Sequence, residues 1–262
     1  GQISSSAAEI YEDFFVPALF GQWPERLLEA AGVAAGQRVL DVGCGTGVLA
    51  RAASRRVGAR GEVVGLDPNE GMLAVARRVG AQTQAVRWQR GVVEDLPFAD
   101  DHFDHVLSQF AVMFFADRGA ALTQMARVTR PGGRVVLASW AALETTPGYA
   151  KMVALIRRRF GDVAAAALEA PFVLGEPESL RALLAEVSQQ VSAVQVAGEA
   201  RFASIRDWVH TDVYGWTLRE LIDARGFEAL LQDAERELSC FCEADGRVRF
   251  AAPAIIASAV IG

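Results

Sequence analysis

The chain has few cysteines and few histidines. It holds three of each among 262 residues, and Cys44, Cys240 and Cys242 cannot build a framework of disulfides. Cys240-Phe241-Cys242 could supply half of a metal site, but no second cysteine or histidine pair stands at ligand spacing, so we expect no metal. Because the sequence also shows no signal peptide, we predict a protein of the reducing cytoplasm.

An excess of positive charge is missing as well. The 26 basic residues are outnumbered by 32 acidic ones. Phosphate neutralisation normally leaves a basic footprint, so the balance argues against a nucleic-acid partner. No apolar run is long enough and free enough of charge to predict a membrane span. With 52% hydrophobic and 22% charged residues, the composition is typical of a soluble globular protein.

One stretch carries most of the information, Val39-Leu40-Asp41-Val42-Gly43-Cys44-Gly45-Thr46-Gly47. Its apolar, β-branched start is typical of a buried strand, and three glycines at alternate positions let the backbone turn tightly and approach a ligand. Apolar residues then recur at helical spacing over residues 48–57. A strand, a glycine loop and a helix N-terminus together favour a nucleotide-like ligand.

A carboxylate ends the next predicted strand, in Gly65-Leu66-Asp67-Pro68. Ligands of open parallel sheets sit outside the carboxyl ends of the strands, where an acid at this distance from the glycine loop can hold a ribose diol. Asp67 could instead cap the helix that begins near Asn69, and both roles can hold at once.

Strand-like and helix-like segments alternate from Gln37 to Trp140, which predicts an α/β fold with a doubly wound parallel sheet. After the first strand, the strand predictions are 63–66, 85–88, 105–107 and 135–138. The later half is less regular, with helical stretches at 149–160, 178–187 and within 205–238. Two further strands, 191–196 and 248–257, could complete the sheet.

The glycine spacing separates two classes of nucleotide-binding protein. Dinucleotide folds use Gly-x-Gly-x-x-Gly, but Val48 stands at the third glycine position here and Gly47 comes one residue earlier. A nicotinamide-dependent oxidoreductase is therefore disfavoured. The Gly-x-Gly-x-Gly form resembles class I S-adenosylmethionine-dependent methyltransferases, and three later blocks resemble segments of that family in the expected order: 91–98, 103–110 and 127–134. The chain is similar to the small-molecule methyltransferases related to the C-methyltransferases of ubiquinone and menaquinone biosynthesis.

This resemblance implies a Rossmann-like, mostly parallel seven-stranded sheet with helical cap insertions. It implies N-terminal helices over the cofactor site at 1–35 and a cofactor-binding core at 36–140. A helical cap and substrate region at 141–240 would be interleaved with the last helix and sixth strand of the core, and 241–262 would form the final strand.

The resemblance also implies S-adenosylmethionine as cofactor and assigns its contacts. Backbone groups of Gly43 and Gly45 would lie near the methionine moiety, and Asp67, followed by Pro68, would bind the ribose. The remaining assignments are Met72 beside the nucleoside, the backbone of Val93 at the adenine, a carbonyl near Ser108 or Gln109 for the ammonium, and Tyr11 near the sulfonium. Tyr11 and the aromatic side chains that follow it could instead form a helix face that simply packs on the core.

One position departs from the family pattern. The acid that commonly receives the adenine amino group falls at Val92, and valine cannot accept a hydrogen bond. Either Glu94 takes that role or adenine is recognised by backbone groups. A solvated turn is the other reading of Glu94.

Methyl transfer from a sulfonium is an in-line displacement, so holding the reactants in place can supply much of the catalysis. A base is needed only when the acceptor must lose a proton. Among the three histidines, His210 is the best candidate because it falls in the predicted cap. The expected partner is a small-molecule acceptor, and the sequence has no motif that names it or fixes an oligomeric state. A protein that binds the cofactor without transferring methyl is the alternative function.

Overall fold

The computed structural model describes residues 5–81, 86–215 and 217–262. Its main sheet has seven strands in the order β3-β2-β1-β4-β5-β9-β6. The strands β1 to β5 are parallel, and β9 runs antiparallel between β5 and β6. The predicted Rossmann-like, mostly parallel seven-stranded sheet is therefore confirmed. The strands are β1 (Arg38–Val42), β2 (Glu62–Asp67), β3 (Val86–Arg90), β4 (Phe103–Gln109), β5 (Thr129–Trp140), β6 (Gln190–Val196) and β9 (Ala254–Val260).

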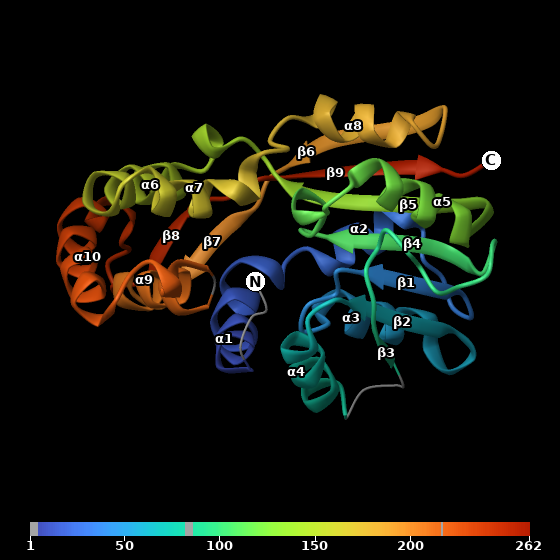
Figure 1. Cartoon of the computed structure of the whole chain (residues 1–262), viewed down its shortest axis with the longest axis horizontal. Helices are drawn as coiled ribbons and strands as arrows, with labels where there is room; N and C mark the ends of the chain where they lie inside the picture. The colour runs from blue at the N-terminus through green and yellow to red at the C-terminus, as the bar shows by residue number, and fades with distance from the viewer. Residues whose placement is uncertain (1–4, 82–85, 216) are drawn as a thin grey trace.

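Helices surround this sheet and build a second, smaller part of the molecule (Figure 1). The helices of the sheet half are α2 (Pro24–Ala31), α3 (Val48–Val57), α4 (Glu70–Gly80), α5 (Arg118–Val128) and α8 (Pro177–Ala185). The cap holds α6 (Pro147–Phe160), α7 (Asp162–Glu169), α9 (Ile205–Tyr214) and α10 (Ala224–Glu237). The N-terminal segment consists of α1 (Ser5–Ile10) and the π-helical η1 (Tyr11–Phe20). Short 3-10 turns are η2 (Gly58–Arg60), η3 (Val112–Phe114), η4 (Leu143–Thr145), η5 (Ala170–Phe172), η6 (Thr217–Glu220) and η7 (Ser239–Phe241).

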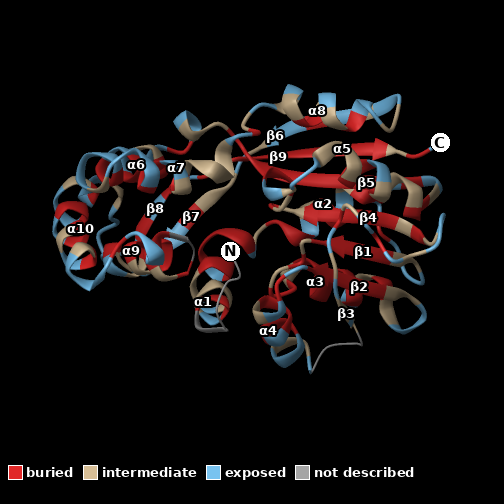
Figure 2. Ribbon diagram, viewed as in Figure 1, coloured by how far each residue is buried: buried red, intermediate tan, exposed pale blue. Residues whose placement is uncertain are grey.

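The central strands form the core because helices cover both of their faces. Helices α2 and α3 pack against each other and the sheet, as do α5 and α8. Strands of this kind read as continuous apolar runs instead of alternating ones. Figure 2 shows β1, β4, β5 and β9 largely buried, whereas the edge strand β6 is mostly exposed.

The predicted strand over 248–257 is wrong as a single element. Val248–Ala251 is β8, which pairs with β7 (Glu199–Phe202) in a separate two-stranded sheet beside the cap helices, and only β9 joins the main sheet. Pro253 separates the two strands, since a proline has no N–H to continue a ladder. The segment 241–262 thus serves both parts of the molecule. The predicted strand 85–88 is β3, and its first residue, Ala85, lies outside the described residues.

The order of the strands fixes where a ligand can enter. The chain winds from β1 to β2 and β3 on one side and then crosses to β4 on the other. The carboxyl ends of β1, β2 and β4 therefore meet at one edge, beside a switch in winding direction. Open α/β sheets bind their ligands at such a point.

Candidate functional site

The glycine loop turns away from β1 through three residues with positive φ. Gly43, Gly45 and Gly47 have φ of 66°, 54° and 87°, a region that disfavours other residues. The backbone N–H groups of Gly43 and Cys44 donate to the carbonyl of Leu66, at 2.8 and 3.0 Å. The loop is thus fixed to the end of β2.

The glycines differ in what surrounds them. A side chain at Gly47 would collide with the ring of Trp88, so this glycine allows Trp88 to pack against α3. A Cβ at Gly45 would have only the ring of Tyr11 nearby, at 3.8 Å. Gly45 therefore faces the open side of the loop, where a ligand can approach the backbone.

Asp67 holds the loop and is itself buried, with 8% of its surface exposed. Its Oδ2 accepts from the N–H of Gly45 at 2.9 Å and its Oδ1 accepts from the N–H of Asn69 at 2.8 Å. Burial raises the pKa of the Asp67 carboxyl against the opposing effect of these two bonds. The alternative reading of Asp67 as helix cap is wrong, because the side chain of Asn69 accepts from the N–H groups of Gly71 and Met72.

A second buried acid lies beneath the loop. Asp41 is 1% exposed, and its Oδ2 accepts from the N–H of Ala50 in the first turn of α3 at 3.0 Å. Its Oδ1 is buried and has no hydrogen-bond partner among the described residues. Burial raises the pKa of Asp41 to about 8.

The stability of the protein should therefore depend on the charge of Asp41. The pKa of this acid is higher in the folded chain, so folding favours its protonated form and the free energy of unfolding falls as pH rises from about 4 to about 8. In Asp41→Asn, this loss disappears while the bond from Ala50 is kept. We expect the free energy of unfolding of the variant, relative to that of the wild type, to increase with pH by up to about 1.4 kcal/mol per pH unit. Urea unfolding at several pH values measures this difference.

Asp104 offers a control of opposite sign. Burial raises the pKa of its carboxyl, but bonds from the Arg38 N–H and the Arg130 guanidinium outweigh burial and hold it below its usual range. Asp104→Asn should therefore be less stable than the wild type above the usual pKa of an aspartate. The difference in the free energy of unfolding should shrink as the pH falls below that value. Equal pH dependence of the wild type and Asp41→Asn would contradict the burial of that charge.

The N-terminal segment covers the glycine loop. Tyr11 stacks on Phe20 with ring centroids 5.1 Å apart, and it packs with Met72 of α4 and Ala8 of α1 in one small apolar cluster. Burial raises the pKa of the Tyr11 hydroxyl, and the negative charge of Asp67 raises it further. The structure thus brings together Tyr11, Met72, Asp67 and Gly45, and their contacts with a cofactor stay predictions.

A buried ion pair fastens this segment to the loop. Arg51 of α3 contacts Glu12 at 2.7 Å, and these side chains are 11% and 12% exposed. The same guanidinium donates to the carbonyl of Thr46 within the loop. One arginine therefore connects η1, the glycine loop and α3.

Gln109 lies at the carboxyl end of β4 and also reaches the N-terminal segment. Its Nε2 donates to the carbonyl of Phe20 at 3.4 Å. Its Oε1 is buried and accepts no hydrogen bond from the described residues, and the same is true of Oγ of Ser108. Buried acceptors without a donor are uncommon, so these atoms indicate a ligand that supplies one.

The loop after β3 holds the other predicted contacts. The side chain of Val93 is buried in the core and that of Val92 is exposed, as is Pro68, which follows β2. Oε1 of Glu94 accepts from the N–H groups of Ala116 and Asp117, at 3.0 and 3.3 Å. Glu94 therefore fixes the loop before α5, a role that the sequence did not suggest.

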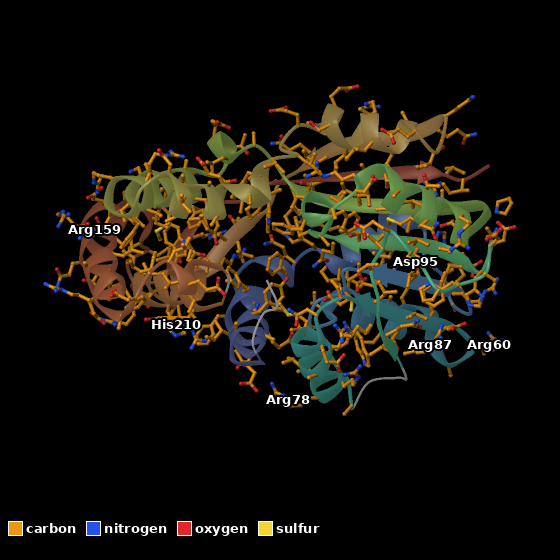
Figure 3. The ribbon with its side chains drawn as sticks, viewed as in Figure 1. Arg60, Arg78, Arg87, Asp95, Arg159 and His210 are labelled. Atoms are coloured by element: carbon orange, nitrogen blue, oxygen red, sulfur yellow. The ribbon has the colours of Figure 1, made fainter. Side chains whose placement is uncertain are left out.

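His210 lies apart from the glycine loop. Its ring packs among Phe14, Tyr214 and Phe227, at centroid distances of 5.5, 5.1 and 6.5 Å. Figure 3 places it at the lower margin of the cap. It does not line the cavity described next, so the geometry gives it no route to a reacting group there.

An aromatic cavity of about 70 Å³ extends from Tyr11 into the cap. Phe20 and Phe110 line it beside Trp140 at the end of β5, and Phe110 stacks on Trp140 with centroids 4.0 Å apart. Tyr149 and Phe172 line it from α6 and η5. The walls of this cavity are largely apolar and carry few polar groups.

Two of those polar groups form a buried pair that sequence reasoning missed. The hydroxyl of Tyr149 donates to Oδ1 of Asp212 on α9 at 3.1 Å. Burial raises the pKa of Asp212 to about 8. The signal is present in the sequence, because Asp212 continues the apolar stripe of Ile205, Trp208 and Val209 at helical spacing.

Comparison with known proteins agrees with this geometry. Residues 40–137 match the family model described as a methyltransferase domain. These residues, from β1 to β5, are thus similar to a methyltransferase domain. Over 133 residues the chain is 39% identical to the demethylmenaquinone methyltransferase of Staphylococcus aureus, which covers 51% of this chain and 55% of that protein. The chain thus spans about half the length of the curated relatives that it matches.

Solved structures match the methyltransferase domain and the cap together. The YcgJ protein of Bacillus subtilis covers 90% of this chain and 96% of its own, with a TM-score of 0.60 and 24% identity. A phosphoethanolamine N-methyltransferase of Haemonchus contortus covers 98% of this chain and 58% of its own, with a TM-score of 0.63 and 18% identity. At these identities the likeness establishes the fold.

The methyltransferase domain fits S-adenosylmethionine at its glycine loop. Asp67 offers carboxylate oxygens at the end of β2, Gly45 leaves its backbone open, and Gln109 has an acceptor oxygen to which no described residue donates. Among the described residues, no cluster of histidine, cysteine and acidic side chains could hold a metal ion. A search of the same residues finds no helix with the length and apolar character of a membrane span.

Proposed function

We propose that this chain transfers a methyl group from S-adenosylmethionine to a small, largely apolar acceptor. The observation that carries the proposal is the continuity of the two sites. Tyr11 lies over Gly45 and also lines the aromatic cavity, so one residue borders both the glycine loop and the space in the cap. A methyl group presented beside Tyr11 would face an acceptor held in that cavity.

The chain's own residues would do three things. Asp67 would bind the ribose hydroxyls, and the acceptor oxygen of Gln109 would receive the ammonium. The rings of Tyr11 and Phe20 would surround the sulfonium, where aromatic faces favour positive charge. The walls of the cavity would exclude water and hold the acceptor in line with the methyl group, which is the part of the catalysis that needs no base.

The relatives support an acceptor with a flat ring. The Staphylococcus aureus relative is named for a quinone derivative, and six aromatic side chains line the cavity in addition to Phe15 and Phe114.

Cys44, Cys240 and Cys242 are free thiols, which supports a reducing compartment such as the cytoplasm.

Transfer of label tests this function. The chain would be incubated with S-adenosylmethionine tritiated in the methyl group and with 2-naphthol or 1,4-naphthalenediol, and the organic extract would be counted. Label in the extract supports methyl transfer. Binding of S-adenosylhomocysteine without transfer to either compound would favour the alternative, a protein that binds the cofactor only, and failure to bind S-adenosylhomocysteine would contradict both functions.

A further inference from the structure

We propose that Asp212 is the proton acceptor of the reaction, that Tyr149 positions its carboxylate, and that the methyl acceptor is therefore an aromatic compound that reacts through a hydroxyl group. This inference rests on the proposed function and specifies the chemistry of its acceptor.

The geometry singles out one oxygen of Asp212. The residue is 2% exposed, and its Oδ1 is occupied by the hydroxyl of Tyr149. Its Oδ2 is buried and has no donor at normal hydrogen-bond geometry among the described residues. The indole N–H of Trp208, also buried and without an acceptor of normal geometry among them, lies beside this carboxylate and lowers its pKa as a side-chain hydrogen-bond donor. Asp212 lines the cavity, so the hydroxyl group of a ligand there would give Oδ2 a well-placed donor.

A second polar atom of the cavity is unpartnered in the same way. Oγ1 of Thr146, the residue that precedes α6, is buried and makes no hydrogen bond within the described part of the chain. The other walls are largely aromatic, with Phe20, Trp140 and Phe172 among them. This arrangement suits a flat apolar molecule that carries hydroxyl groups at one end.

The titration of Asp212 suits the transfer of a hydroxyl proton. Burial raises the pKa of its carboxyl to about 8, closer to that of a phenol, near 10, than an ordinary carboxyl would be. Tyr149 on α6 and Tyr11 on η1 are the titratable groups that share the cavity with it. On its own helix, Asp207 caps the first turn with Ser204, and His210 packs against Phe14.

The step balances without any further reactant. The hydroxyl proton of the acceptor moves to Oδ2 of Asp212, and the electron pair of the hydroxyl oxygen forms the new bond to the methyl carbon. The bond from that carbon to sulfur breaks, and its electrons stay on sulfur. Asp212 is left neutral and returns its proton to solvent when the products leave.

A carboxyl titration tests the proposal apart from turnover. In protein with ¹³C-labelled aspartate, the Asp212 resonance is assigned by its loss in Asp212→Asn and followed with pH in the presence of S-adenosylhomocysteine. Addition of 2-naphthol should lower the pKa of Asp212, because a hydroxyl that donates to Oδ2 stabilises the carboxylate. An unchanged pKa would overturn the proposal. So would a pKa that changes with phenethylamine, an aromatic compound with an amine and no hydroxyl group, but not with 2-naphthol.

Kinetics give the second measurement. In the wild type, kcat should rise with pH as Asp212 loses its proton. Asp212→Asn should lower kcat by about 100-fold or more and remove this rise, whereas Tyr149→Phe should move the rise to higher pH. Both variants should keep the affinity for S-adenosylhomocysteine, so a failure of the proposed function would be seen separately as absent binding in the wild type.

Asp233→Asn is the control, since that cap carboxylate pairs with Arg159 and Arg236. A kcat and pH profile of Asp212→Asn equal to those of the control would assign Asp212 a structural role only.

Discussion

Asp67→Ala is expected to weaken the binding of S-adenosylhomocysteine by about 100-fold or more, since each hydrogen bond to a charged group contributes about 1.5–3 kcal/mol and a ribose diol would make two. The same change removes the acceptor for the N–H of Gly45, so the loop loses a restraint as well as a ligand contact. Isothermal titration calorimetry of the wild type and the variant measures the effect.

Asp95→Ala is the matched control for this experiment. Asp95 is an exposed acid on the sheet half of the molecule (Figure 3), so its loss should leave the affinity unchanged. Circular dichroism should show that both variants are folded. Equal affinity of Asp67→Ala and Asp95→Ala would contradict the ribose role of Asp67.

Arg51→Met is expected to lower the free energy of unfolding by about 3–5 kcal/mol, because removing one partner of a buried ion pair leaves the other charge uncompensated. Arg51 and Glu12 are both largely buried, and Arg51 also donates to Thr46. Since this arginine fastens η1 to the glycine loop, the affinity for S-adenosylhomocysteine should fall too. Urea unfolding and calorimetry measure these two effects.

The double variant Arg51→Met with Glu12→Gln separates the stranded charge from the loss of packing. It should recover part of the stability lost in Arg51→Met, because no charge is then buried alone. Arg78→Met is the control, since its contact with Glu9 is exposed. If Arg51→Met were as mild as Arg78→Met, the buried pair would not anchor the N-terminal segment.

The core could be predicted from the sequence because its signals are local. The apolar run before Gly43, the alternate glycines and the acid at Asp67 each follow from the backbone of one strand and the turn after it. Those same residues meet in space because parallel strands present their carboxyl ends at a common edge. Even so, the requirement for Gly47 comes from Trp88, a contact between segments distant in the sequence.

The cap could be predicted only in outline. Its helices follow from their apolar stripes, but the assignment of 248–257 to the main sheet overlooked the break that Pro253 imposes. The sequence predicts His210 as the candidate base, but the apolar stripe of α9 holds Asp212 and leaves His210 on another face. The partner of Asp212 is Tyr149, 63 residues earlier, so only the folded chain reveals the pair.

The N-terminal segment lies between these cases. The aromatic side chains of η1 predict a buried helix face, and Tyr11 was expected near the sulfonium. The ion pair between Glu12 and Arg51, which connects that helix with the glycine loop, has no sequence signature because it joins two elements across 39 positions. Tertiary contacts of this kind decide how the site is closed.

A crystal structure with S-adenosylhomocysteine bound would show whether the glycine loop and the aromatic cavity form one active site. We expect the ribose hydroxyls on Asp67, the amino group at Gln109, and the sulfur beside Tyr11 with the aromatic cavity beyond it. S-adenosylhomocysteine bound away from the glycine loop, or with its sulfur facing away from the cavity that holds Asp212, would contradict this expectation.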